Sequence, residues 1–257
     1  MAGSVAGMLL ADLGADVLTL RSPGRGPSAS DPGRHVWDRN KRAAVLDSSI
    51  ARDVDALDPL VEGADIVLVG TTEPAITYDQ LCGRGLSPGR GAGWIVMPPY
   101  VLGHTPWAGG AESAGMLFSW LGQAWSQASY DDVPVDCLYP LALYMQGVWS
   151  ATVAVATLVG SRAGHDVGRL AVVGGAHGAM LTSPGGFAVA RDDPHVHRPG
   201  GPGGTLPNYR CYRCADGLWL FFGAFTTAFM RRGFAAVSYT HLDVYKRQVL
   251  GEEPKTQ

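Results

Sequence analysis

Lysine is scarce in this chain, and charge of either sign is modest. Of the 20 lysine and arginine residues only 3 are lysines, and Lys41 is the only one before Lys246. Charged residues make up 17% of the 257 residues and the formal net charge is −3. This composition provides no general electrostatic attraction to nucleic acid or to an anionic membrane.

Long apolar runs and a common catalytic signature are also absent from the sequence. No stretch reaches the roughly 18 consecutive apolar residues of a membrane-spanning helix, and the first residues lack the charged-then-apolar layout of a signal peptide. The sequence contains no HExxH motif. Because 46% of the residues are hydrophobic, the chain can form a core, and we expect a cytoplasmic protein.

Cysteine is rare, and its arrangement favours free thiols over a metal site. The 4 cysteines include one CxxC pair, Cys211 and Cys214, which lies downstream of His195 and His197. Such side chains are typical zinc ligands. Both cysteines, however, fall in a predicted strand, where a spacing of three places them on opposite faces. We therefore expect reduced thiols and no metal.

A glycine-containing turn precedes the first predicted helix, which covers residues 6–13 and ends at Gly14. Gly3, in this turn, could bring backbone N–H groups close to an anion. The spacing is not GxGxxG, however, and Arg21 stands where nicotinamide-binding folds carry an acidic residue. The sequence therefore argues against a dinucleotide site.

Apolar segments alternate with helical segments, which is typical of an α/β protein with a parallel sheet. We predict strands over residues 16–20, 43–46, 65–69, 93–97 and 170–173, and further helices over 52–61, 113–127 and 147–162. A β-hairpin over 209–222 is expected to turn at Asp216-Gly217. We expect a large domain over residues 1–183, and a linker with the start of a smaller domain over 184–237.

Both ends of the sequence indicate a truncated fragment. A turn, a helix and a strand open the chain, which is two thirds of a βαβ unit with its first strand missing. From Ser238 onward the sequence resembles a string that recurs at the ends of unrelated metagenomic reading frames, and two of the three lysines lie within this tail. We therefore expect residues 238–257 to be a non-native tail.

Taken in order, five segments resemble CoA-transferase family III, the group of formyl-CoA transferase, carnitine CoA-transferases and α-methylacyl-CoA racemases. Residues 2–17 are very similar to the family opening AGPxAGMLLADLGADV, and Asn40-Lys41-Arg42 with Leu46-Asp47 resembles N(R/K)xKRSxxLD. Residues 63–67 resemble ADVVVEN, residues 103–108 resemble GxTGPYA, and residues 207–217 resemble PxYRxYxxxDG. The resemblance covers residues 1–237.

This resemblance implies a Rossmann-like large domain, a smaller domain and an interlocked homodimer. It also implies coenzyme A or acyl-CoA and a carboxylic acid as ligands. In the family an aspartate carboxylate attacks the acyl-CoA thioester to form a mixed anhydride, and CoA is later handed to the acceptor acid. By the resemblance, Lys41 and Arg42 would meet the nucleotide phosphates, Asn40 the adenine or ribose edge, and Gly3 would be a further binding residue.

The chain departs from the family at the position of that aspartate. Alignment on Pro140 and Gly147 places Leu143 there, and leucine can act neither as a nucleophile nor as a base. Asp136 lies seven residues away and does not align, so the role is not transferred to it.

Three hypotheses follow for the function. The first is that the chain is an enzyme that transfers CoA between a thioester and a carboxylic acid. Alternatively, it is a degenerate half that binds CoA or serves as a structural partner in a tandem or heteromeric transferase, which Leu143 favours. The third hypothesis is a racemase-like enzyme with His104 as one base, but it lacks a second base at Leu143.

Overall fold

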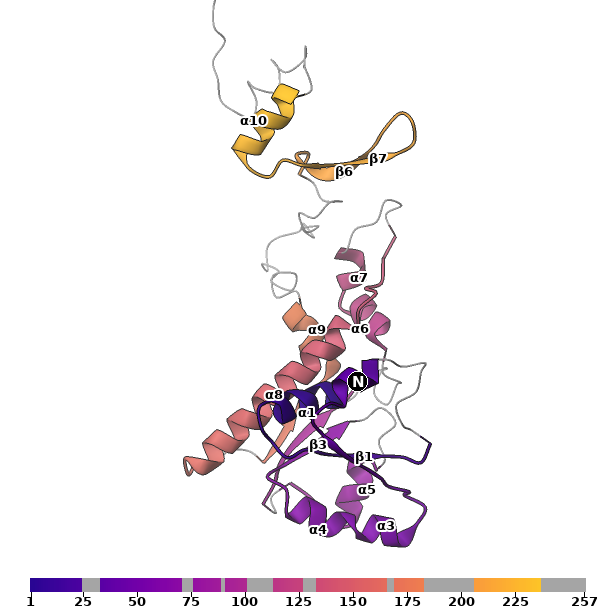
Figure 1. The fold of residues 1–257 in the computed structure, drawn as a ribbon, viewed down its shortest axis with the longest axis vertical. Helices are drawn as coiled ribbons and strands as arrows, with labels where there is room; N and C mark the ends of the chain where they lie inside the picture. The colour runs from indigo at the N-terminus through magenta and orange to yellow at the C-terminus, as the bar shows by residue number, and fades with distance from the viewer. Residues whose placement is uncertain are drawn as a thin grey trace, which may run out of the picture. The chain divides into compact units, whose positions relative to one another are not determined.

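The computed structural model describes residues 1–24, 33–70, 76–88, 91–100, 113–126, 133–165, 169–182 and 206–236 (Figure 1). The chain divides into two compact units. Unit 1 contains residues 1–124 and 136–189, and unit 2 contains residues 125–135 and 190–257.

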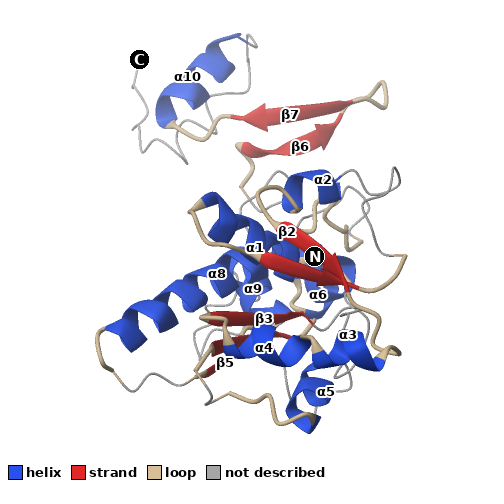
Figure 2. Ribbon diagram, turned by 60° about the horizontal axis from the view of Figure 1, so that its bottom comes forward, coloured by secondary structure: helices blue, strands red, loops and turns tan. Residues whose placement is uncertain are grey.

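Two parallel sheets form the centre of unit 1 (Figure 2). In the first sheet, β1 (Leu18–Arg21) pairs with β2 (Arg42–Val45) in a register that places Leu18 opposite Arg42. The second sheet has the order β3-β4-β5, and its strands are β3 (Ile66–Gly70), β4 (Gly93–Met97) and β5 (Leu170–Val172). The predicted α/β class with parallel strands is therefore confirmed.

Helices connect and cover these strands. The described helices that begin in unit 1 are α1 (Ala2–Asp12), α2 (Gly33–Trp37), α3 (Ala51–Asp55), α4 (Leu57–Glu62), α5 (Tyr78–Gly83), α6 (Ala114–Trp120), α7 (Gln123–Ser126), α8 (Leu141–Arg162) and α9 (Gly175–Thr182).

Several predicted helix boundaries are wrong. The expected turn around Gly3 is helical, because α1 already begins at Ala2 with Met1 as its N-cap. The helix predicted over 113–127 breaks at Gly122, whose φ of 73° continues no right-handed helix. The helix predicted from residue 147 begins at Leu141, so Leu143 lies in its first turn.

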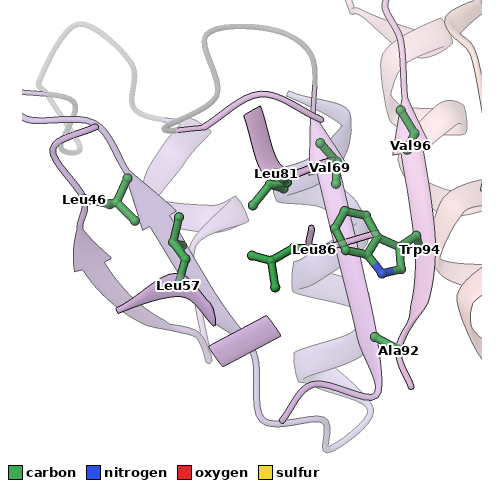
Figure 3. Packing of buried hydrophobic residues seen from close by; sticks show 8 residues of the cluster. All are labelled: Leu46, Leu57, Val69, Leu81, Leu86, Ala92, Trp94 and Val96. Atoms are coloured by element: carbon green, nitrogen blue, oxygen red, sulfur yellow. The ribbon is translucent and has the colours of Figure 1, made fainter. Parts of the chain in front are cut away.

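The core of unit 1 lies on both faces of β4, whose five residues are all buried. Trp94 and Val96 face a first cluster with residues of β3, α4 and α5 (Figure 3). Ile95 and Met97 point to the opposite face, where α1 and α8 pack. A third cluster joins α6, α8 and α9, and its buried members are Tyr100, Leu117, Phe118, Ala124, Ala142, Leu143 and Ala179.

Glycines allow α1 and α9 to approach the backbone of α8 closely. A Cβ at Gly147 would stand 2.7 Å from the Ala2 carbonyl oxygen, and one at Gly178 would stand 2.2 Å from the Ala142 carbonyl oxygen. Both glycines are therefore required for the observed packing, which fixes the first turns of α8 against two neighbouring helices.

By length and composition, α8 is the one helix in the described ranges that could cross a membrane. In the structure it packs against α1, α9 and β4. A buried core helix passes the same test of length and hydropathy.

The described part of unit 2 consists mainly of a β-hairpin and a helix. β6 (Tyr209–Arg213) pairs antiparallel with β7 (Trp219–Gly223), and α10 (Thr227–Ala236) follows. At the turn, the Asp216 carboxylate accepts a hydrogen bond of 2.9 Å from the Leu218 N–H, and Gly217 has a φ of 85°. The predicted Asp-Gly hairpin is therefore confirmed.

Candidate functional site

The carboxyl ends of three parallel strands and the first turns of α1 and α8 come together in unit 1. Gly3 in α1 faces Met97, the last residue of β4, since a Cβ at Gly3 would stand 3.4 Å from the Met97 methyl group. The buried Gln146 side chain donates to the carbonyl oxygens of Pro98 and Val173, at 2.8 and 2.7 Å, directly after β4 and β5. Ligands of open α/β sheets bind at this edge.

Lys41 reaches toward this edge along α1. Its Nζ donates to the Ser4 carbonyl oxygen at 3.1 Å and lies 3.3 Å from Asp38 Oδ1, and its side chain is only 2% exposed. Gly7 leaves room for the lysine stem, because a Cβ there would stand 3.4 Å from Lys41 Cδ. Lys41 is thus buried against α1 with its ammonium group at the first turn of that helix.

Asp38 is shared by two cations. Arg21, the last residue of β1, donates from Nη2 to Asp38 Oδ2 at 2.7 Å, and these side chains are 19% and 13% exposed. Burial lowers the pKa of Lys41 from its ordinary value, although Asp38 opposes this effect. Two cations and one carboxylate leave an excess of positive charge, which a bound anion would neutralise. We name Arg21, Asp38 and Lys41 the cation cluster.

Asn40 and Arg42 point to the other end of α1. The Asn40 side-chain amide donates to Asp12 Oδ1 at 2.8 Å, and Arg42 makes two hydrogen bonds with Asp16, of 2.8 and 2.7 Å. A hydrogen bond from Arg39, together with that from Asn40, lowers the pKa of Asp12. The structure therefore separates Asn40 and Arg42 from Lys41 and Gly3, with which the sequence analysis grouped them.

An aromatic pair joins α2 to the first turn of α8. The Trp37 indole N–H donates to the Tyr144 hydroxyl oxygen at 2.8 Å. The two rings meet edge to face, with centroids 5.8 Å apart and an interplanar angle of 74°. Trp37 directly precedes Asp38. The end of α2 therefore contacts α8, and the next residue belongs to the cation cluster.

Leu143 lies beside Tyr144 in the first turn of α8 and is 5% exposed. It belongs to the third cluster, with aromatic and aliphatic neighbours. Asp136 is exposed, accepts a hydrogen bond of 2.8 Å from the Cys137 N–H, and lies against Gly115, where a Cβ would stand 2.6 Å from Asp136 Oδ2. An apolar side chain therefore occupies position 143.

The remaining predicted positions give the following picture. His104 lies outside the described residues. Cys82, Cys137, Cys211 and Cys214 are free thiols, and the described residues hold no group of three or more His, Cys, Asp and Glu side chains that could bind a metal ion. The binding roles of Gly3, Asn40, Lys41 and Arg42 stay predictions.

Sequence reasoning missed Trp37 and Tyr144. Both stand next to residues that it considered, since Trp37 precedes the 38–42 segment and Tyr144 follows Leu143. Their contact joins positions 107 apart in the chain, and neither helical periodicity nor motif spacing contains a signal for such a pair.

Comparisons with known proteins identify the family. The model of CoA-transferase family III matches residues 1–81 and 103–253, and the second range extends into the tail that we expect to be non-native. The CoA-transferase/lyase DddD of Marinomonas sp. (strain MWYL1) is 38% identical over 68 residues, which are 26% of this chain and 8% of that protein.

Solved structures share the fold. The Rv3272 protein of M. tuberculosis matches with a TM-score of 0.69 and 18% identity, over 98% of this chain and 69% of that one. A CAIB/BAIF family protein from Brucella suis matches with a TM-score of 0.62 and 20% identity, over 86% of this chain and 62% of that one. Because the family model matches most of the sequence, this chain belongs to CoA-transferase family III.

Proposed function

We propose that this chain binds CoA thioesters and takes part in CoA transfer to a carboxylic acid, as a unit that lacks its own nucleophilic carboxylate. The observation that carries this proposal is Leu143, which is 5% exposed in an apolar cluster at the family's aspartate position. A leucine there can shape a pocket for an acyl chain, but it cannot form the mixed anhydride.

The cation cluster supports the binding half of the proposal. Arg21 and Lys41 share one carboxylate, Asp38, so a phosphate group of CoA would find uncompensated positive charge. Among the described residues, the Lys41 ammonium group has two acceptors, Ser4 and Asp38, for its three N–H donors. Phosphate groups are strong acceptors for such donors.

A second unit with a carboxylate would complete the reaction. DddD offers a precedent in length: the same 68 residues are 26% of this chain and 8% of that protein, which is therefore about three times as long. On the outer face of α8, Val148, Trp149, Val155 and Val159 are exposed. An apolar helix face of this kind supports an interface with a partner half or a second copy. The four free thiols support a reducing compartment, the cytoplasm.

The first experiment measures binding. CoA is titrated calorimetrically into the 257-residue chain and into the Lys41→Met variant, with Arg52→Met as a matched control, because Arg52 is 93% exposed. We expect saturable binding that Lys41→Met weakens by about 1–3 kcal/mol if a desolvated phosphate contact exists, while Arg52→Met has no effect. Absence of CoA binding by the wild type would contradict the proposal.

The second experiment tests the missing carboxylate. Wild type and Leu143→Asp are incubated with acetyl-CoA, quenched with acid and digested at low pH for mass spectrometry. A second aliquot is treated with hydroxylamine, which removes an anhydride or thioester adduct. The proposal predicts no acyl or CoA adduct on the wild type and an adduct at position 143 in Leu143→Asp. An adduct on wild-type protein would instead identify a complete transferase, with its nucleophile at the modified residue.

A further inference from the structure

The Tyr144 hydroxyl is held from one side only. Its oxygen accepts the hydrogen bond of 2.8 Å from the Trp37 indole N–H, and an indole N–H can only donate. A phenol can accept and donate at the same time, and no hydrogen bond from the Tyr144 hydroxyl to another described residue is recorded. Within the described part of the chain, the hydroxyl proton therefore has no acceptor.

The surroundings indicate which acceptor fits. Tyr144 is half-buried, follows the apolar Leu143, and lies in the first turn of α8 at the carboxyl edge of the strands. Its partner Trp37 directly precedes Asp38 of the cation cluster. Trp37 thus links the Tyr144 hydroxyl to the segment of the chain that carries the cation cluster.

We propose that the Tyr144 hydroxyl, oriented by Trp37, donates a hydrogen bond to the thioester carbonyl oxygen of a bound acyl-CoA. This inference rests on the proposed binding of CoA thioesters. The donor is uncharged and so is the acceptor, which suits a half-buried site beside a leucine. Accepting from the indole also polarises the phenol and strengthens it as a donor.

This role differs from that of a nucleophile. The hydrogen bond polarises the carbonyl and positions the acyl group, while every covalent bond of the thioester and of Tyr144 stays intact. A purely structural Trp37–Tyr144 contact would only hold α2 against α8. Its loss would then change the affinity for all CoA compounds equally. The two roles are separated by comparing a ligand that has a carbonyl with one that lacks it.

The test compares acetyl-CoA with CoA, which contains the same nucleotide and pantetheine but no thioester carbonyl. Dissociation constants of both are measured for wild type, Tyr144→Phe, Trp37→Phe and the control Tyr139→Phe, which changes an exposed tyrosine five residues earlier. Loss of one neutral hydrogen bond weakens acetyl-CoA binding by about 2- to 10-fold in Tyr144→Phe. CoA binding is unchanged, Trp37→Phe gives a smaller loss for acetyl-CoA, and Tyr139→Phe leaves both constants unchanged.

An infrared measurement compares the wild-type complex with the Tyr144→Phe complex. The carbonyl band of acetyl-CoA labelled with ¹³C at the carbonyl lies at lower wavenumber in the wild-type complex, because the hydrogen bond from Tyr144 weakens the C=O bond. An unshifted band overturns the inference, as does an equal effect of Tyr144→Phe on both ligands. If the wild type binds neither ligand, the proposed function itself fails, so the two failures are distinguishable.

Discussion

Substitutions at Leu143 test whether the first turn of α8 is a packed apolar site. Leu143 is 5% exposed and packs in a cluster with Leu117 and Phe118. Leu143→Ala removes buried methyl groups and leaves a cavity, for which we expect a loss of about 2–5 kcal/mol in the free energy of unfolding. Leu143→Asn adds a buried amide without an apparent partner, which costs about 1–3 kcal/mol beyond the lost packing.

Leu143→Asp separates the cost of charge from the cost of shape. An aspartate has nearly the volume of asparagine, but burial among apolar side chains raises its pKa above the unfolded value of about 3.9. The folded state then binds more protons than the unfolded state above that pH. Stability of Leu143→Asp relative to Leu143→Asn therefore falls as the pH rises through the window between the two pKa values.

The assay is urea unfolding of the wild type and the three variants at pH 4 and pH 8, followed by tryptophan fluorescence. We expect the Asp and Asn variants to be similarly stable at pH 4 and the Asp variant to be the weaker one at pH 8. If Leu143→Asp matched Leu143→Asn at both pH values, or if Leu143→Ala cost nothing, the site would be solvated and our account of it would be wrong.

Three further predictions concern packing and charge. Gly178→Ala places a Cβ 2.2 Å from the Ala142 carbonyl oxygen, so we expect a loss of about 1–3 kcal/mol or more in urea unfolding. Burial lowers the pKa of Lys41 from 10.5, so the folded state binds fewer protons than the unfolded state just below that pH. The free energy of unfolding therefore rises with pH up to that value, and its rise between pH 8 and pH 10 should be smaller in Lys41→Met. Arg42→Ala breaks a pair with Asp16 whose side chains are 67% and 73% exposed. Because solvent screens such a pair, we expect an unchanged Tm, and a clear fall in Tm on thermal unfolding would contradict this.

The strands could be predicted because their signal is local. β4 is buried on both faces and is apolar throughout, which is how a central parallel strand reads in sequence. The helix starts could not be predicted in the same way. The helix was expected to begin at Gly147, but it begins at Leu141. Gly147 is needed because α1 crosses α8 at that point. A tertiary contact therefore decides a feature that looks like a local boundary.

The site could be predicted only in part, for a geometric reason. Asn40, Lys41 and Arg42 are consecutive, but successive residues entering a strand point in opposite directions. Lys41 extends to Ser4 in the first turn of α1, while its neighbours bind Asp12, the last residue of α1, and Asp16 beyond it. A motif that is continuous in sequence thus divides between two places, and position in the motif does not establish a shared ligand.

Rigidity of the first turns of α8 connects the leucine at position 143 with the proposed donor, Tyr144. The contacts of Gly147 with α1 and of Gly178 in α9 with Ala142 leave no space for α8 to shift, and Gln146 ties α8 to the ends of β4 and β5. Position 143 therefore faces its apolar cluster and the Tyr144 hydroxyl faces Trp37 in a fixed relation. Such a scaffold can orient a thioester without reacting with it, because binding requires only preorganised donors and a packed wall. A leucine at position 143 is thus compatible with the proposed binding of an acyl-CoA.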